Sequence, residues 1–127
     1  MPAVVHHGKP VLHIVDNDAS VRDGLFRLAV AAGFEAHVYP SIEHFLGRHS
    51  PDPHGCVLLD ASLPDGARIR ASTQDLGIAC PVIMLSTDHG EIDRQRARNA
   101  GAGFLLHKPV DAQALFDAIA WVTDGGS

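Results

Sequence analysis

Short apolar runs that end in polar residues recur along this chain and predict a buried parallel sheet. The run at 56–59 ends in Asp60, and residues typical of turns lie on both sides of it. Similar runs lead into Asp16, Ser86 and Lys108. The carboxyl ends of parallel strands meet at one edge of an open sheet, and ligands bind there. We therefore expect these four polar residues to lie close together.

Between the strands, apolar residues recur with the spacing of amphipathic helices, and glycines mark several helix ends. Strand and helix alternate five times, which is typical of a doubly wound α/β domain with helices on both faces of a parallel sheet. The predicted strands are 11–15, 35–39, 56–60, 82–85 and 103–106, and the predicted helices are 20–32, 41–46, 66–76, 91–100 and 111–122.

Several details of this prediction depend on single residues. Ser20 and Asp111 are expected to be the N-caps of the first and last helices, because their side-chain oxygens can accept hydrogen bonds from the first backbone N–H groups. Val38 is expected on the inward face of the second strand. Ile92 and Ala97 are expected to form the sparse apolar side of the fourth helix.

The composition fits one domain. The chain has 127 residues, of which 46% are apolar and 20% charged, so it can bury a core. We expect a flexible lead-in at 1–10, the domain at 11–123 and a flexible tail at 124–127. The net charge of −5 argues against nucleic acid as a direct partner. Without a long apolar run or a secretory pattern, we expect a cytoplasmic protein that does not enter a membrane, in which Cys56 and Cys80 are buried thiols.

The residues at the predicted sheet edge suit phosphoryl chemistry. Clustered carboxylates such as Asp16 and Asp60 repel one another and need a cation, and hard oxygen ligands suit Mg²⁺. Lys108 supplies a point charge for a phosphoryl oxygen, and Ser86 or Thr87 supplies a hydroxyl donor. A carboxylate in such surroundings can act as a covalent nucleophile. Asp60 is therefore a plausible phosphoryl acceptor.

Several local motifs, in the right order and spacing, together resemble the receiver domain of two-component response regulators. The resemblance covers about residues 10–123 and is strongest to the nitrogen-fixation-type regulators. It rests on 14–18 followed by 20–22, 58–60 with Pro64, 81–86, 100–102, and Lys108-Pro109. It implies a flavodoxin-like fold of five strands and five helices, with strand order 2-1-3-4-5. It also implies a signalling domain and not an enzyme.

The resemblance implies specific roles and partners. Asp60 would be phosphorylated by a histidine kinase or a phosphotransfer protein, in a phosphorelay, and Ser86, Thr87 and Lys108 would hold the phosphoryl group. The bond from Lys108 to Pro109 is often cis in this family. The signal would leave through the face formed by the fourth helix, the fifth strand and the fifth helix, toward a downstream protein, an output domain or a second copy of the chain.

The chain departs from the family at the implied Mg²⁺ ligands, which are Asp16, Asn17, Asp60 and the backbone carbonyl of Ser62. The second ligand is usually an acid, and Asn17 keeps an oxygen but lacks the charge. Fewer ligand charges mean weaker binding of a hard cation, so we expect weak Mg²⁺ binding. Asp18 is a substitute that falls one residue late. The loop after Asp60 is also about two residues shorter than in the family.

The second departure lies on the output side. Family members usually carry Tyr or Phe three residues before the lysine, where this chain has Leu105. Phe104 is its neighbour, and it points to the opposite side of the strand because successive side chains alternate. The arginines of the fourth helix, Arg94, Arg96 and Arg98, are expected to form a solvated face, with a docking surface as the alternative.

Two other functions remain open from the sequence. The departures at Asn17 and Leu105 also fit a degenerate receiver that binds a protein partner without phosphorylation. Asp16 and Asp18 have the D-x-D form of haloacid-dehalogenase-type phosphatases, in which Ser86 and Lys108 would be the second and third motifs. That phosphatase alternative is remote, because no later strand delivers the family's final acidic metal pair.

Overall fold

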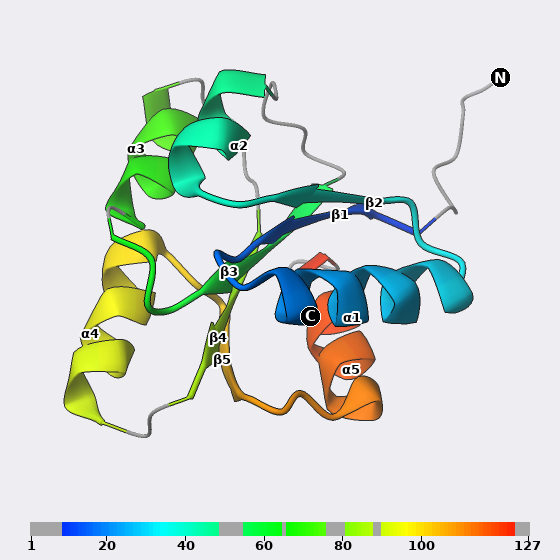
Figure 1. The fold of residues 1–127 in the computed structure, drawn as a ribbon. Helices are drawn as coiled ribbons and strands as arrows, with labels where there is room; N and C mark the ends of the chain where they lie inside the picture. The colour runs from blue at the N-terminus through cyan, green and yellow to red at the C-terminus, as the bar shows by residue number, and fades with distance from the viewer. Residues whose placement is uncertain (1–8, 49–54, 65, 76–80, 88–89, 124–127) are drawn as a thin grey trace, which may run out of the picture.

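The computed structural model describes residues 9–48, 55–64, 66–75, 81–87 and 90–123, which form a parallel sheet between two layers of helices (Figure 1). The sheet has the order β2-β1-β3-β4-β5, so the predicted doubly wound fold and strand order are confirmed. The elements in chain order are β1 (Val11–Val15), α1 (Ala19–Ala31), β2 (Ala36–Tyr39), α2 (Ile42–Arg48), β3 (Gly55–Asp60), α3 (Ala67–Asp75), β4 (Val82–Ser86), α4 (Glu91–Ala100), β5 (Phe104–His107) and α5 (Ala112–Thr123).

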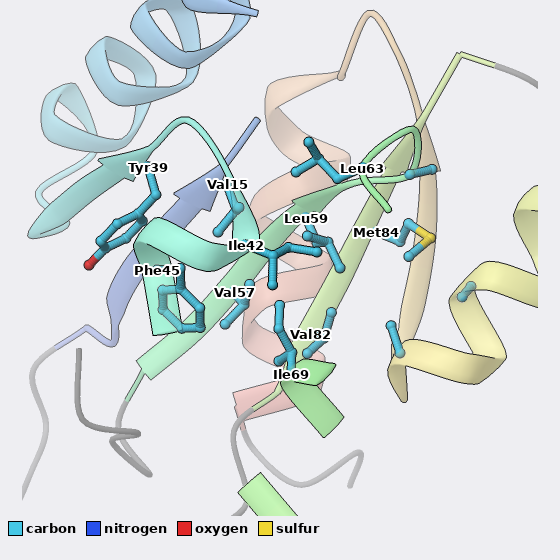
Figure 2. Packing of buried hydrophobic residues seen from close by; sticks show 13 residues of the cluster. Val15, Tyr39, Ile42, Phe45, Val57, Leu59, Leu63, Ile69, Val82 and Met84 are labelled. Atoms are coloured by element: carbon cyan, nitrogen blue, oxygen red, sulfur yellow. The ribbon is translucent and has the colours of Figure 1, made fainter. Parts of the chain in front are cut away.

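Each face of the sheet carries its own apolar core. Helices α2, α3 and α4 cover one face, and α1 and α5 cover the other (Figure 1). On the first face, Ile42 and Phe45 of α2 and Ile69 of α3 pack against Val57 and Leu59 of β3 (Figure 2). On the second face, the buried residues are Leu12, Ile14, Leu25, Ala29, Cys56, Leu58, Ile83, Leu85, Leu115, Ala118 and Ile119.

Strand β3 lies at the centre of the sheet, and all six of its residues are buried. It pairs with β1 on one side and with β4 on the other, with Leu59 opposite Val15 and Met84. A parallel strand that is covered on both faces needs apolar side chains at every position, and this accounts for the continuous apolar run. Asp60, its last residue, lies opposite Leu85 and therefore reaches the carboxyl edge of the sheet.

The predicted N-cap of the first helix was wrong, whereas that of the last was right. Asp18, and not Ser20, caps α1: its Oδ1 accepts hydrogen bonds from the backbone N–H groups of Ser20 (2.9 Å) and Val21 (3.3 Å). Asp18 has the extended backbone that an N-cap requires, and α1 begins directly after it, at Ala19. At α5, the backbone N–H of Ala114 donates to Oδ2 of Asp111 over 2.8 Å, as predicted.

Two apolar residues that were expected to point inward are exposed. Val38 is 41% exposed at the edge strand β2, where Tyr39, on the opposite face, is the buried residue. Ile92 is 66% exposed. Ala97 is buried, as predicted, and the buried side of α4 is completed by Asp93 and Ala100, which lie four residues before it and three after it. The sequence of α4 thus contains too few apolar residues to predict which face is buried.

Backbone geometry and a lysine contact fix the ends of two helices. Gly33 (φ 90°) and Gly101 (φ 73°) follow α1 and α4 in the left-handed region, as the predicted helix stops require. Lys9 donates to the backbone carbonyl of Ala32, and its Nζ lies 5.0 Å from the centroid of the Phe34 ring. Several predicted features lie outside the described residues: residues 1–8 of the lead-in predicted at 1–10, the tail at 124–127, the loop at 49–54, the helix end at Leu76 and the thiol of Cys80.

Candidate functional site

The carboxyl ends of four strands bring the predicted polar residues to one edge of the sheet. Asp16 follows β1 directly, Asp60 ends β3 and Ser86 ends β4. The backbone N–H of Lys108, just after β5, donates to the carbonyl of Ser86 over 2.7 Å, which fixes the lysine beside β4. Residues that are up to 92 positions apart in the chain are therefore neighbours here.

The side chain of Lys108 lies between two carboxylates. Its Nζ donates to Oδ2 of Asp16 over 2.8 Å and to Oδ1 of Asp60 over 3.3 Å, and both acids are buried. Burial by itself would lower the pKa of Lys108, but the hydrogen bond to Asp16 and the charges of both carboxylates outweigh it and hold the pKa above the usual 10.5. The lysine is therefore a permanent cation at neutral pH.

Further donors orient both carboxylates. Oδ1 of Asp16 accepts a hydrogen bond from the backbone N–H of Asp18 over 2.9 Å. Oδ1 of Asp60 accepts one from the backbone N–H of Ser62 over 3.2 Å, and Oδ2 accepts one from the Ser62 hydroxyl over 2.8 Å. Arg22 donates to the backbone carbonyl of Asp16 over 2.8 Å and so ties α1 to the site. Each carboxylate oxygen of Asp16 and Asp60 is thus held by at least one donor.

The other predicted site residues are more exposed than Asp16, Asp60 and Ser86. Asn17, Ser62 and Thr87 are exposed. Asp18 is engaged as the N-cap of α1 through its Oδ1, so this oxygen is committed to the helix. Sequence position alone could not show this, because an acid after a strand serves equally well as a metal ligand or as a helix cap.

The donor types at the site suit a hard divalent cation, although the charge is low. Carboxylate and amide oxygens are typical Mg²⁺ ligands, and each carboxylate oxygen can accept more than one interaction. Asp16 and Asp60 with Lys108 leave one negative charge in excess. Across the described ranges, no group of three or more His, Cys, Asp or Glu side chains is arranged to hold a metal ion. The carboxylate oxygens of Asp16 and Asp60 are nevertheless of the kind that Mg²⁺ prefers.

Ser86 is fully buried, and its hydroxyl donates to Oδ2 of Asp93 on α4. Asp93 is itself only 6% exposed. This acid was not among the residues predicted from the sequence. The available signal was its place in the helix, because Asp93 lies four residues before Ala97 and seven before Ala100, on the stripe of α4 that is buried.

The arginines of α4 differ from one another. Nη1 of Arg96 donates to the backbone carbonyl of Ala61 over 3.2 Å and lies 3.4 Å from Oδ1 of Asp93, although the side chain is about half-exposed, as predicted for this face. Arg94 and Arg98 pair with the exposed carboxylate of Glu91 at 3.6 and 2.8 Å. The hydrogen bond from Arg98 holds the pKa of Glu91 below its usual value.

Leu105 and Phe104 lie on opposite faces of β5, as the alternation of side chains predicted. Leu105 packs against the core under α2, α3 and α4. Phe104 packs against the core under α1 and α5, where its ring meets the ring of Trp121 edge-on at 6.4 Å. The face of β5 nearer α4 therefore carries an aliphatic side chain. The peptide bond between Lys108 and Pro109 is cis.

Solved structures share this architecture. The FixJ-N crystal structure is 26% identical in sequence and aligns with a TM-score of 0.79 over 91% of this chain and 94% of that one. The structure of response regulator StyR is 35% identical and aligns with a TM-score of 0.77 over 94% of this chain and 61% of that one.

Curated relatives agree with the structural matches. Nodulation protein W of Bradyrhizobium diazoefficiens is 33% identical over 119 residues, which are 91% of this chain and 52% of that protein. Transcriptional regulatory protein FixJ of Rhizobium meliloti is 31% identical over 111 residues, which are 85% of this chain and 54% of that protein. The chain thus spans about half the length of these relatives.

The family model for the response regulator receiver domain matches residues 12–120. This match covers all five strands and the site at their carboxyl ends. Receiver domains are signalling modules and not enzymes, so the phosphatase alternative is discarded. No helix within the described part of the chain has the length and apolar character needed to cross a membrane. The chain belongs to the response regulator receiver domain family of two-component signal transduction.

Proposed function

We propose that the chain accepts a phosphoryl group on the carboxylate of Asp60 from a histidine kinase or a phosphotransfer protein in the cytoplasm. The observation that carries this proposal is the position of Lys108, whose ammonium group lies 3.3 Å from Oδ1 of Asp60 and is held there by Asp16. A cation beside the acceptor neutralises the negative charge that an incoming phosphoryl group brings. If Asp60 belonged to a purely structural turn, the ammonium group of Lys108 would have no phosphoryl charge to neutralise.

Each residue of the site would contribute a separate part of the reaction. An oxygen of Asp60 would attack the phosphorus of a phosphohistidine on the donor protein, and the bond from phosphorus to the histidine nitrogen would break, so that the imidazole leaves. Lys108 would pair with one phosphoryl oxygen, and Ser86 would donate its hydroxyl to another. Thr87, exposed beside Ser86, would line the edge of the phosphoryl-binding site. Asp16 and Asp60, with the amide oxygen of Asn17 and the backbone carbonyl of Ser62, would hold Mg²⁺ weakly. The metal would supply further charge neutralisation.

The output would leave through the surface of α4, β5 and α5. Ile92 on α4 and Trp121 on α5 are exposed there, at 66% and 49%. Exposed apolar side chains of this size suit a protein partner, which would be a downstream protein, an output domain or a second copy of the chain. With a net charge of −5, this domain would not itself contact nucleic acid.

A degenerate receiver that binds a partner without phosphorylation is the second candidate. It is favoured by the neutral, exposed Asn17 and by the Ser86 hydroxyl, which is engaged by Asp93. The two candidates differ in one respect that can be measured. Only a phosphoryl acceptor responds to a phosphoryl donor at Asp60.

The deciding experiment treats the protein with acetyl phosphate or beryllofluoride, with and without Mg²⁺, and follows the backbone amide resonances by NMR. A phosphoryl acceptor shows Mg²⁺-dependent shifts around Asp60, Ser86 and Lys108, and Asp60→Asn abolishes them. Asp117→Asn, the same change on the exposed side of α5, should leave the response intact. If the shifts are absent at high Mg²⁺, or persist in Asp60→Asn, the acceptor assignment is wrong and the degenerate receiver is favoured.

A further inference from the structure

A continuous series of polar contacts joins β4, α4 and the loop after β3. The hydroxyl of Ser86, at the end of β4, donates to Oδ2 of Asp93 in the first turn of α4. Arg96, one turn further along α4, lies 3.4 Å from Oδ1 of the same carboxylate. The guanidinium of Arg96 also donates to the backbone carbonyl of Ala61 over 3.2 Å, and Ala61 directly follows Asp60. The series therefore begins and ends beside the proposed phosphoryl acceptor.

The first of these contacts limits what Ser86 can do. A serine hydroxyl has a single proton to donate. While that proton is donated to Asp93, it cannot also be donated to a phosphoryl oxygen on Asp60. Binding of a phosphoryl group through Ser86 thus requires the bond to Asp93 to break, and hydrogen bonds to charged acceptors are the stronger ones.

A structural role alone would account for Asp93 most simply. An acid in the first turn of a helix is stabilised by the helix dipole, and Gly90, the N-cap of α4, provides no side-chain cap. The carboxylate of Asp93, however, has its two oxygens turned toward Ser86 and Arg96, which lie on the side of the sheet edge. Its contacts lead to the site, and this goes beyond what a helix cap needs.

We propose that Asp93 is a positioning residue that sets the availability of the Ser86 hydroxyl and couples phosphoryl occupancy of Asp60 to the first turn of α4. This inference rests on the proposed function. When a phosphoryl group recruits Ser86, Asp93 retains Arg96, so the Asp93–Arg96 pair is released from β4 while Arg96 still contacts the loop at Ala61. Leu105 stands on β5 where the family usually carries an aromatic residue, so the connection from the site to α4 is made by the polar contacts of Ser86, Asp93 and Arg96.

The test measures the affinity for beryllofluoride at a fixed Mg²⁺ concentration, by NMR titration. Asp93→Ala removes the competing acceptor, so binding should tighten by about tenfold, which corresponds to the loss of one hydrogen bond to a charged group. Asp93→Asn keeps an acceptor without the charge and should give a smaller gain, about threefold. It also preserves the size of the side chain, in case the alanine variant does not fold.

Two further variants separate positioning from stability. Combined with Ser86→Ala, the Asp93→Ala change should no longer affect the affinity, because Asp93 acts through the serine hydroxyl. A merely structural acid would lower the melting temperature in both backgrounds and would leave the affinity unchanged in both. Glu91→Gln, which removes an exposed acid from the same turn of α4, is the matched control and should not change the affinity.

Each outcome decides the inference. It is supported if the wild type binds and the Asp93 variants bind more tightly in a Ser86-dependent way, or if only the Asp93 variants bind. If the wild type and the Asp93 variants bind equally, the inference is overturned while the proposed function stands. If neither the wild type nor any variant binds, both the inference and the proposed function are overturned.

Discussion

The domain contains two buried carboxylate networks that differ in their charge balance. In the first, Asp16 and Asp60 share the single ammonium group of Lys108, so one negative charge is left over. In the second, Asp93 has the guanidinium of Arg96 and the hydroxyl of Ser86, so its charge is matched. Both networks lie at the same end of the sheet and are supplied by neighbouring strands and helices.

The difference separates a reactive site from a supporting one. Uncompensated charge in a buried position costs stability, and structures that retain it usually do so for a function. The excess charge beside Asp60 leaves room for a cation and a reacting group. The matched pair at Asp93 has no such excess, and its contacts hold neighbouring groups in place. Three substitutions test this contrast, from the largest expected effect to the smallest.

Replacing the shared cation should have the largest effect. Lys108→Met leaves two buried acids without a counter-charge, so the free energy of unfolding at pH 7 should fall by about 3 kcal/mol. Urea denaturation of wild type and variant measures this difference. Because the folded pKa of Lys108 is raised, its contribution is fully present below pH 10.5 and is lost as the pH rises through the folded value.

The gap between wild type and variant should therefore be constant from pH 7 to about 10 and should narrow above 10.5. Arg27→Met removes the same charge from an exposed side chain of α1 and should change the free energy of unfolding only slightly. A variant at Lys108 that is as stable as the wild type would show that the two acids do not depend on the shared cation.

Adding charge to the unbalanced network should have an intermediate effect. Asn17→Asp restores a second acid beside Asp16 and should strengthen Mg²⁺ binding on the order of tenfold, because ligand charge sets the affinity of a hard cation. Calorimetric titration with MgCl₂ measures the dissociation constant. Asn99→Asp makes the same change on the exposed side of α4 and serves as the control. Equal Mg²⁺ affinities in the two variants would remove Asn17 from the metal site.

Breaking the balanced network from its exposed side should have the smallest effect. Arg96→Met removes the contacts to Asp93 and to the carbonyl of Ala61, but the guanidinium is about half-exposed and well screened. The free energy of unfolding should fall by about 1 kcal/mol, as measured by urea denaturation. A loss as large as that of Lys108→Met would mean that the two networks are equally sensitive, and the contrast between them would fail.

Most of the fold could be predicted from the sequence, because a continuous apolar run such as the one in β3 fits an α/β chain best as a buried parallel strand. The predictions failed where a residue type allows two local solutions. Ser20 and Asp18 are both good N-caps, and only the backbone angles of Asp18 decide between them. Ile92 lies one position from the buried stripe of α4, which contains too few apolar residues to reveal its direction.

The proximity of Asp16, Asp60 and Lys108 was predictable as well, since it follows from the strand ends alone. The role of Asp93 was not. A buried acid on a helix rich in charged residues looks like one more solvated side chain until its partners across the fold are known, and both Ser86 and the carbonyl of Ala61 are supplied by other elements.

The buried thiol of Cys56 gives the central strand a chemical reporter. It lies in β3, four residues before Asp60, with 0% exposure. A thiol reagent can reach it only when the sheet opens, so the rate of its modification counts opening events of the strand that carries the acceptor. In a Cys80→Ser background, where Cys56 is the one remaining cysteine, this rate compares how often the site's scaffold comes apart in each variant.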